Sequence, residues 1–195
     1  GAIVPSTAQE PLIVPVNQIL DTRAKYTPQE LAQFSSRIWP EAVRDFKRCG
    51  IQLQSSQREA EIRRSPGGRP VFTGLEHGII NLALTDYIPL NWDNGRGLHG
   101  VTTQHDGYHL CVIALKYAHC HQIPFLSINT CVHELLHVLL HDIFETRPKG
   151  LPGHGREFRI DFYATRLWLF HDGSGIRNAA HAYLARSASN LVAHT

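Results

Sequence analysis

The sequence predicts one α+β domain, in which a small mixed β-sheet packs against an N-terminal helix and a buried helix that carries histidines. Three observations predict this class. The chain has 195 residues, 43% of them apolar and 18% charged, which suits one buried core. Helical periodicity marks both ends of the chain, and strand-like alternation marks its middle. We therefore expect a single domain over residues 1–195, with a helical C-terminal part and an extended, proline-containing arm over residues 1–17.

The first helix is expected to begin at Thr27-Pro28-Gln29-Glu30. This segment is a capping box with proline at the first helical position. Pro40 lies inside the helix and removes one backbone hydrogen bond, so a kink or break is expected there. Apolar residues recur at helical spacing as far as Cys49-Gly50: Leu31, Phe34, Ile38, Trp39, Ala42 and Phe46.

The middle of the chain is expected to form the sheet. The predicted strands are residues 51–54, residues 79–85 and the two arms of a hairpin, 98–103 and 108–115, which turns at 105–107. The charged segment 57–64 is interpreted as a short helix. Loops are expected at residues 65–70 and 92–97.

A nearly charge-free helix follows Pro124, with Ser127 or Asn129 as its N-cap. Because leucine and valine surround most of its circumference, this helix must be buried. A loop rich in proline and glycine at residues 146–153 ends it, and two further helices are expected at about 155–173 and 176–191.

The composition excludes some classes of protein. The formal net charge of +2 is too small a surplus to indicate a polyanionic partner, so it neither requires nor excludes nucleic acid. No window of eighteen apolar residues exists, which excludes a membrane-spanning helix. The four cysteines (49, 111, 120 and 131) form no C-x-x-C pair, and Cys111 and Cys131 are expected to be buried thiols.

The compartment is left open by this cysteine usage. The chain lacks methionine and starts at Gly1, so we expect its natural start to lie upstream. Removal of a leader there would fit a secreted or extracytoplasmic protein.

The buried helix carries the pattern H-E-x-x-H as His133-Glu134-Leu135-Leu136-His137. Residues four apart share one helix face, so the two histidines can hold one metal ion. A catalytic zinc ion needs three protein ligands, an open position for water and a base that takes the water's proton. Glu134 is expected to be this base. The composition would yield this pattern by chance about 0.04 times per chain. The alternative interpretation is that His133 and His137 are core histidines that bind no metal, with Glu134 pointing to solvent.

The third ligand has two candidates among the later histidines. His141 lies roughly 12 Å along the helix axis from His133, too far to share an ion with both histidines. His154 follows a turn that allows the chain to fold back, so it is the preferred candidate.

These residues resemble a known family. The H-E-x-x-H pattern followed by Gly153-His154-Gly155-Arg156-Glu157-Phe158 is similar to the zincin metallopeptidases, specifically to the SprT-type pattern G-H-G-x-x-F. The resemblance implies a zincin-like fold, with zinc held by His133, His137 and His154 on a metal-binding active-site helix. It also implies a metalloendopeptidase in which Glu134 activates a zinc-bound water to cut a peptide or protein substrate.

The segment from Gly97 to Thr102 resembles the edge strand above the active helix of metzincin-like zincins. There an extended peptide adds to the sheet, which implies substrate binding at Leu98, Gly100 and Val101. The ligand resemblance covers residues 131–158, and with this strand 97–158. The chain departs from true metzincins, since Leu140 and Ile143 stand where those enzymes have glycine and a third histidine.

Two other functions remain open. One is a zinc-binding module without turnover. The other is a DNA-associated protease of SprT type, which a surface stripe of Arg63, Arg64, Arg69 and Arg96 would favour. DNA-repair relatives of that type have a separate zinc ribbon or DNA-binding tail, and the sequence has no C-x-x-C pair, so nucleic acid is not expected as a partner. An oxyanion-stabilising residue is also expected, with Tyr108, Tyr163 and His171 as unresolved candidates.

Overall fold

The structure is a computed structural model that describes residues 10–64, 70–88, 98–105, 107–121, 128–141 and 154–193. The loops predicted at 92–97 and 146–153 lie outside the described residues, as do residues 65–69 of the loop predicted at 65–70 and the N-cap candidate Ser127. No helix in the described part is both long enough and apolar enough to cross a membrane.

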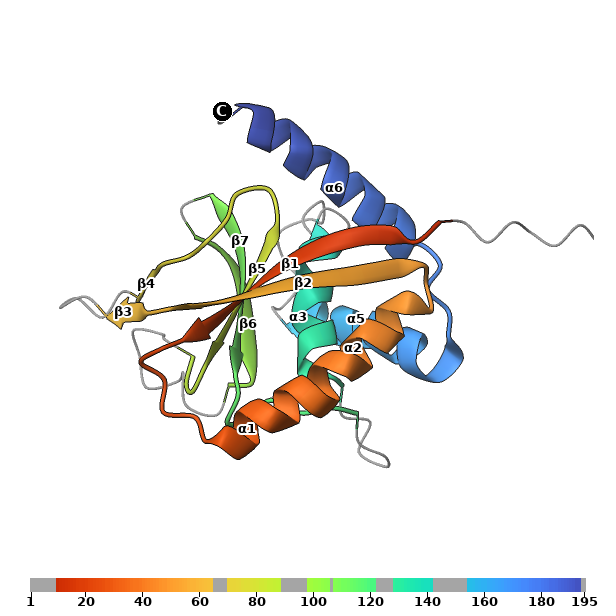
Figure 1. The fold of residues 1–195 in the computed structure, drawn as a ribbon. Helices are drawn as coiled ribbons and strands as arrows, with labels where there is room; N and C mark the ends of the chain where they lie inside the picture. The colour runs from red at the N-terminus through yellow and green to blue at the C-terminus, as the bar shows by residue number, and fades with distance from the viewer. Residues whose placement is uncertain are drawn as a thin grey trace, which may run out of the picture.

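A mixed five-stranded sheet forms the centre of the molecule, with the strand order β2-β1-β5-β7-β6 (Figure 1). All neighbours are parallel except β6 and β7, which are antiparallel. The strands are β1 Leu12–Asp21, β2 Ile51–Ala60, β5 Ile80–Thr85, β6 Gly100–His105 and β7 Tyr108–Ala114. The α+β class with a mixed sheet is therefore confirmed, as are the strand at 79–85 and the predicted hairpin.

Strand β1 corrects the expected N-terminal arm. The arm was expected to reach residue 17, but from Leu12 onward the chain is a strand between β2 and β5. The prolines of residues 1–17 predicted an extended arm because proline is rare inside a strand. Pairing with β5 begins only at Val16, so Pro15 removes no bond from that ladder by lacking an N–H.

The predicted short helix at 57–64 is also wrong. Strand β2 continues to Ala60, paired with β1 along its whole length, and a short strand β3 (Ile62–Arg64) follows. The second half of β2 lies at the sheet edge with its side chains exposed. Because neither face of that half is buried, its sequence lacks the alternation that identifies a strand.

The first helical segment begins as predicted and is interrupted before Pro40. Thr27 and Glu30 form the capping box of α1 (Pro28–Gln33). A π-helical turn, η1 (Phe34–Ile38), then leads into α2 (Trp39–Lys47), in which Pro40 occupies the first turn. The regular α-helical bonding therefore stops just before the proline, where its missing N–H costs least.

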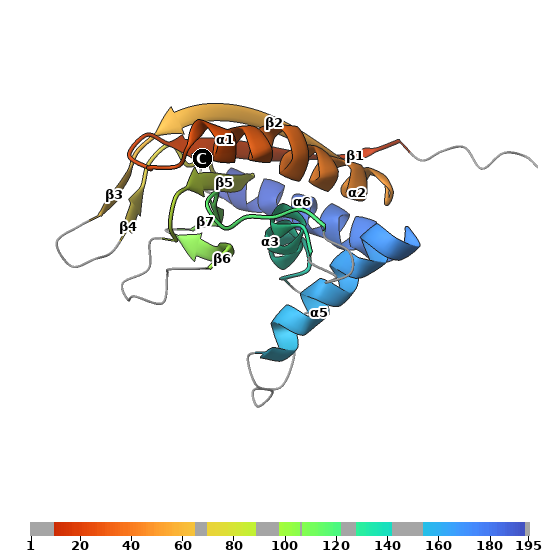
Figure 2. The same cartoon turned by 90° about the horizontal axis from the view of Figure 1, so that it is seen from below.

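The later helices follow the predicted order. They are α3 Thr130–Leu139, α5 His154–Thr165, the π-helical η3 Arg166–Phe170 and α6 Ile176–Ala193. The helices lie together on one face of the sheet (Figure 2). The opposite face has a smaller cluster around Leu110 and Val112, covered partly by β3 and by β4 (Pro70–Phe72).

Helix α3 lies in the middle of the helical layer, in contact with β6, β7, α2, α5 and α6. Its leucines and valines are buried, as predicted, among apolar side chains such as Phe46, Ile113 and Ile160. Cys111 and Cys131 are buried free thiols, which confirms that prediction. The only partly exposed residues of α3 are His133 and His137.

Candidate metal centre

The start of α3 is fixed by Asn129, one of the two predicted N-caps. Its Oδ1 accepts from the backbone N–H of Val132 at 3.1 Å. Its amide nitrogen donates to the Ile38 carbonyl at 2.9 Å and to Glu41 Oε1 at 3.0 Å. These bonds join α3 to η1 and α2, so the axial position of the two histidines is set by the first helical segment.

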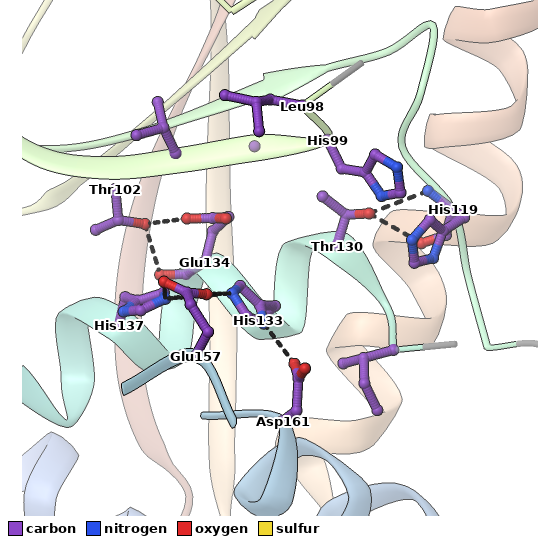
Figure 3. Close-up of a pocket in the computed structure, with 13 residues that line it drawn as sticks. Leu98, His99, Thr102, His119, Thr130, His133, Glu134, His137, Glu157 and Asp161 are labelled. Carbon is purple, nitrogen blue, oxygen red and sulfur yellow. Dashed lines mark hydrogen bonds and ion pairs between the residues drawn. The ribbon is translucent and has the colours of Figure 1, made fainter. Parts of the chain in front are cut away.

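His133 and His137 meet a carboxylate from α5. The Nε2 atoms of the two histidines are 3.2 Å apart. Glu157 lies across from them, with Oε2 2.5 Å from His133 Nε2 and Oε1 3.1 Å from His137 Nε2. Three ligand atoms from two helices therefore converge on one point (Figure 3).

The spacing of these atoms suits a zinc ion. Ligand atoms held about 2.0–2.2 Å from a tetrahedral zinc are about 3.3 Å or slightly more from each other. With Glu157 Oε2 as the carboxylate ligand atom, its distance to His137 Nε2 and the distance between the two Nε2 atoms are both 3.2 Å, close to this value. Its distance of 2.5 Å to His133 Nε2 must widen to admit an ion. Two imidazoles and one carboxylate are also a donor set found at catalytic zinc sites.

Asp161 orients the first histidine. It lies one turn after Glu157 on α5, and its Oδ1 is 2.7 Å from His133 Nδ1. A carboxylate on Nδ1 holds the ring so that Nε2 faces the ligand position, and it makes the imidazole a stronger donor to a metal. His133 is thus held from two sides by α5.

The two carboxylates attract positive charge to this cluster. Burial lowers the pKa of His133, but hydrogen bonds to Asp161 and Glu157 and the charge of Glu134 outweigh it and raise that pKa to about 10. Hydrogen bonds from His133 and His137 hold the pKa of Glu157 well below its usual range. A proton on His133 or a divalent cation can supply the charge that these carboxylates require.

Glu134 points from α3 toward Thr102 on β6 (Figure 3). Its side chain is buried, and Oε2 accepts from Thr102 Oγ1 at 2.5 Å. Burial raises the pKa of Glu134, against the lowering effects of His133 and of the Thr102 hydrogen bond. A carboxylate with a raised pKa is a better proton acceptor near neutral pH.

Gly100 lets β6 approach this carboxylate closely. A Cβ atom at Gly100 would lie 2.9 Å from Glu134 Cγ and 3.1 Å from its Oε1. Any other residue would push the strand away from α3. The glycine therefore sets the distance between the sheet edge and Glu134.

The metal-binding cluster, Glu134 and the nearby part of β6 line one cavity of about 620 Å³. Its lining includes Leu98, Gly100 and Val101, so the predicted substrate segment and the predicted histidine pair face one space. The residues that complete the lining are His99, Thr102, His119, Ile128, Thr130, His133, Glu134, His137, Glu157 and Asp161.

His154 begins α5 three residues before Glu157, but its side chain lies outside the described part of the structure. Its assignment as third ligand therefore stays a prediction. His141 is absent from the described lining of the cavity. The three oxyanion candidates are also absent from the described lining of the cavity. Tyr108 stacks on His77, Tyr163 packs on the core, and His171 is exposed after η3.

Sequence reasoning missed Glu157, Asp161 and Thr102. The two acidic residues lie one helical turn apart and twenty or more residues after His137. Two acidic residues at i and i+4 share one face of a helix, so their spacing could have predicted an acidic face on the helix that follows the histidines. Thr102 carried no signal, because its role depends on how closely β6 lies above α3.

The arginine stripe that would favour a DNA-associated protease is described at one of its four positions. Arg63 pairs with Glu61 at 2.6 Å, so its charge is partly neutralised. The side chains of Arg64, Arg69 and Arg96 lie outside the described residues.

Comparisons with models of protein families, with curated proteins and with solved structures gave no match.

Proposed function

We propose that this protein is a zinc-dependent endopeptidase with a zincin-like active site. The proposal is carried by one observation: a buried carboxylate, Glu134, lies beside a His133–His137–Glu157 cluster in a cavity bordered by a sheet edge. Burying a carboxylate is costly unless it is hydrogen-bonded or paired, and Glu134 is held by Thr102 and by the nearby charges of His133 and His137, inside the cavity.

Each residue has a distinct role in this proposal. His133, His137 and either Glu157 or His154 hold the ion, which polarises water and the substrate carbonyl when bound. Glu134 takes a proton from the attacking water and later passes it to the leaving amine. Thr102 holds the Glu134 carboxylate in place, and Asp161 holds the His133 ring.

Strand β6 supplies the surface on which an extended peptide would bind. The N–H of Ala114 donates to the His99 carbonyl at 2.9 Å, so residues 99, 101 and 103 direct their backbone groups toward β7. Residues 100, 102 and 104 direct theirs toward the open side of β6, the last strand of the described sheet. A peptide added there would therefore pair with the backbone of Gly100 and Thr102, directly above Glu134.

This register revises the use of Val101 as a substrate residue. Its backbone pairs with Val112, and its side chain packs on the cluster at the opposite face of the sheet. A proline at Val101 would damage the β6–β7 ladder rather than the free edge. Gly100 and Thr102 are the positions that test peptide binding.

The experiment is hydrolysis of an unfolded protein, casein, by the zinc-loaded chain. We expect turnover that a chelator abolishes and added zinc restores. Glu134→Gln keeps the shape of the side chain but removes its basicity, so zinc content should stay near wild type while kcat falls by about 10²-fold or more. Glu59→Gln, an exposed glutamate on β2, is the matched control and should change neither quantity.

Each outcome assigns the function. Zinc binding without casein turnover would identify a zinc-binding module and overturn the proposal. Full activity in Glu134→Gln would show that another group accepts the proton. Loss of zinc from Glu134→Gln would make Glu134 a ligand instead of the base.

A further inference from the structure

Two histidines that the metal centre does not use lie in the same cavity. His99 precedes β6 and His119 precedes α3, and both line the cavity with Glu134 and His133. Their rings meet edge to face, with centroids 4.5 Å apart at an angle of 88°. In Figure 3 this pair and Thr102 lie on opposite sides of Glu134.

The backbone holds both rings in place. The carbonyl of His99 accepts from the N–H of Ala114 at 2.9 Å, which fixes it to β7. His119 donates its N–H to Thr130 Oγ1 at 3.1 Å, and its carbonyl accepts from the Thr130 N–H at 3.0 Å. Since Thr130 begins α3, the His119 ring is fixed to the helix that carries the metal ligands and supports the ring of His99.

His99 is the more accessible of the two rings. Its side chain is exposed toward the cavity, whereas His119 is half-buried. Burial, and then the charge of His133, lower the pKa of His99. A histidine with a lowered pKa is neutral near pH 7 and can donate one ring N–H without losing its proton.

We propose that His99 donates a hydrogen bond to the substrate carbonyl oxygen while negative charge develops there. The inference rests on the proposed peptidase function. As the water oxygen bonds to the carbonyl carbon, Glu134 takes one water proton and the π electron pair moves onto the carbonyl oxygen. That oxygen receives the His99 hydrogen bond.

When the carbon–nitrogen bond breaks, the pair returns to the carbonyl and Glu134 passes its proton to the departing nitrogen. The second water proton leaves the new carboxylic acid. His99 transfers no proton and is unchanged at the end of the cycle. A donor aimed at the developing oxyanion lowers the barrier more than it strengthens substrate binding.

Zinc-loaded His99→Phe and His99→Gln test the proposal against wild type. Phenylalanine keeps an aromatic ring against His119 but has no donor, and glutamine keeps a donor. We expect His99→Phe to lower kcat on casein-derived peptides by about 100-fold, with KM changed by less than about threefold and zinc content unchanged. His99→Gln should recover part of this loss. His181→Phe, an exposed histidine on α6 outside the cavity lining, is the control and should match wild type.

A second readout is the affinity for a phosphinic peptide built on the preferred casein cleavage site, because its tetrahedral phosphorus group mimics the oxyanion. His99→Phe should weaken this affinity by about the same factor as kcat, as expected for a transition-state contact. An active wild type whose His99→Phe variant is equally active and binds the phosphinic peptide equally well overturns this inference and leaves the peptidase function intact. An inactive wild type overturns the proposed function itself.

Discussion

Two residues of α5 are candidates for the third ligand of the metal centre. Glu157 is the one whose carboxylate contacts both imidazoles, at 2.5 Å and 3.1 Å. His154, the residue implied by the SprT-type motif, lies three positions earlier on the same helix. Positions i and i+3 fall on one face of a helix, so the sequence places both residues on the same face of α5. A catalytic site that keeps one open position needs only one of them.

Zinc content of purified variants distinguishes these two ligands. We expect Glu157→Ala to lose more zinc than His154→Ala, because the Glu157 carboxylate already lies at the ligand position. His141→Ala should keep its zinc, since His141 is not in the described cavity lining. The opposite order for Glu157 and His154, measured by metal analysis after dialysis, would assign the third position to His154.

At the scale of the element, β6 and α3 form one unit. The strand has the free edge and the helix carries Glu134, the proposed base, and their separation is set by Gly100, a position without a side chain. A Cβ at Gly100 would crowd both Glu134 and the Val112 carbonyl, which lies 3.1 Å from it. The β7 backbone cannot move without disturbing its pairing with β5, so the strain must fall on β6 or on Glu134.

Gly100→Ala should therefore reduce activity without removing the metal. We expect kcat/KM for peptides to fall by about 10- to 100-fold, because small displacements of a reacting group have effects of that size. Zinc content should stay at the wild-type level. Thr103→Ala changes an exposed side chain of the same strand and is the control. Wild-type kcat/KM in Gly100→Ala would show that the strand and Glu134 need not be so close.

The same elements show what the sequence could and could not predict. Helix α3 and the β6–β7 hairpin were predictable because their apolar patterns are local. Strand β1 was not, since its one proline, Pro15, is tolerated only because pairing with β5 begins after it, at Val16. The same limit applies to the site. His133 and His137 belong to a five-residue pattern, whereas Glu157 contacts them only because α5 packs on α3.

At the scale of the whole molecule, the C-terminal helices are held against the N-terminal ones. The guanidinium of Arg48 donates to the carbonyls of Leu167 and Trp168 at 3.4 Å and 3.3 Å. The Trp168 ring stacks on His121, whose Nε2 is 2.6 Å from Asp45 Oδ2. These contacts join η3 to α2. Because η3 continues α5, they also fix the helix that carries Glu157 and Asp161.

Gly173 packs closely against Cys49 in this region. A Cβ at Gly173 would overlap the Cβ of Cys49 and lie 2.9 Å from its Cα, so neither a rotamer change nor a small shift relieves it. Gly173→Ala should lower the free energy of unfolding by about 1–3 kcal/mol, the usual cost of forcing extra volume into a packed site. For a chain of this length, thermal unfolding should then occur about 2–4 °C lower for each kcal/mol lost.

A double-mutant cycle identifies the contact responsible. Cys49→Gly removes the atom that Gly173→Ala would strike, so the double variant should be more stable than the sum of the two single effects predicts, by at least about 0.5 kcal/mol. Cys49→Ala keeps the Cβ and should give no such relief. Additive effects in the Cys49→Gly cycle would mean that the two chain segments separate without cost. The position of α5 over the metal centre would then have to depend on its direct contact with α3.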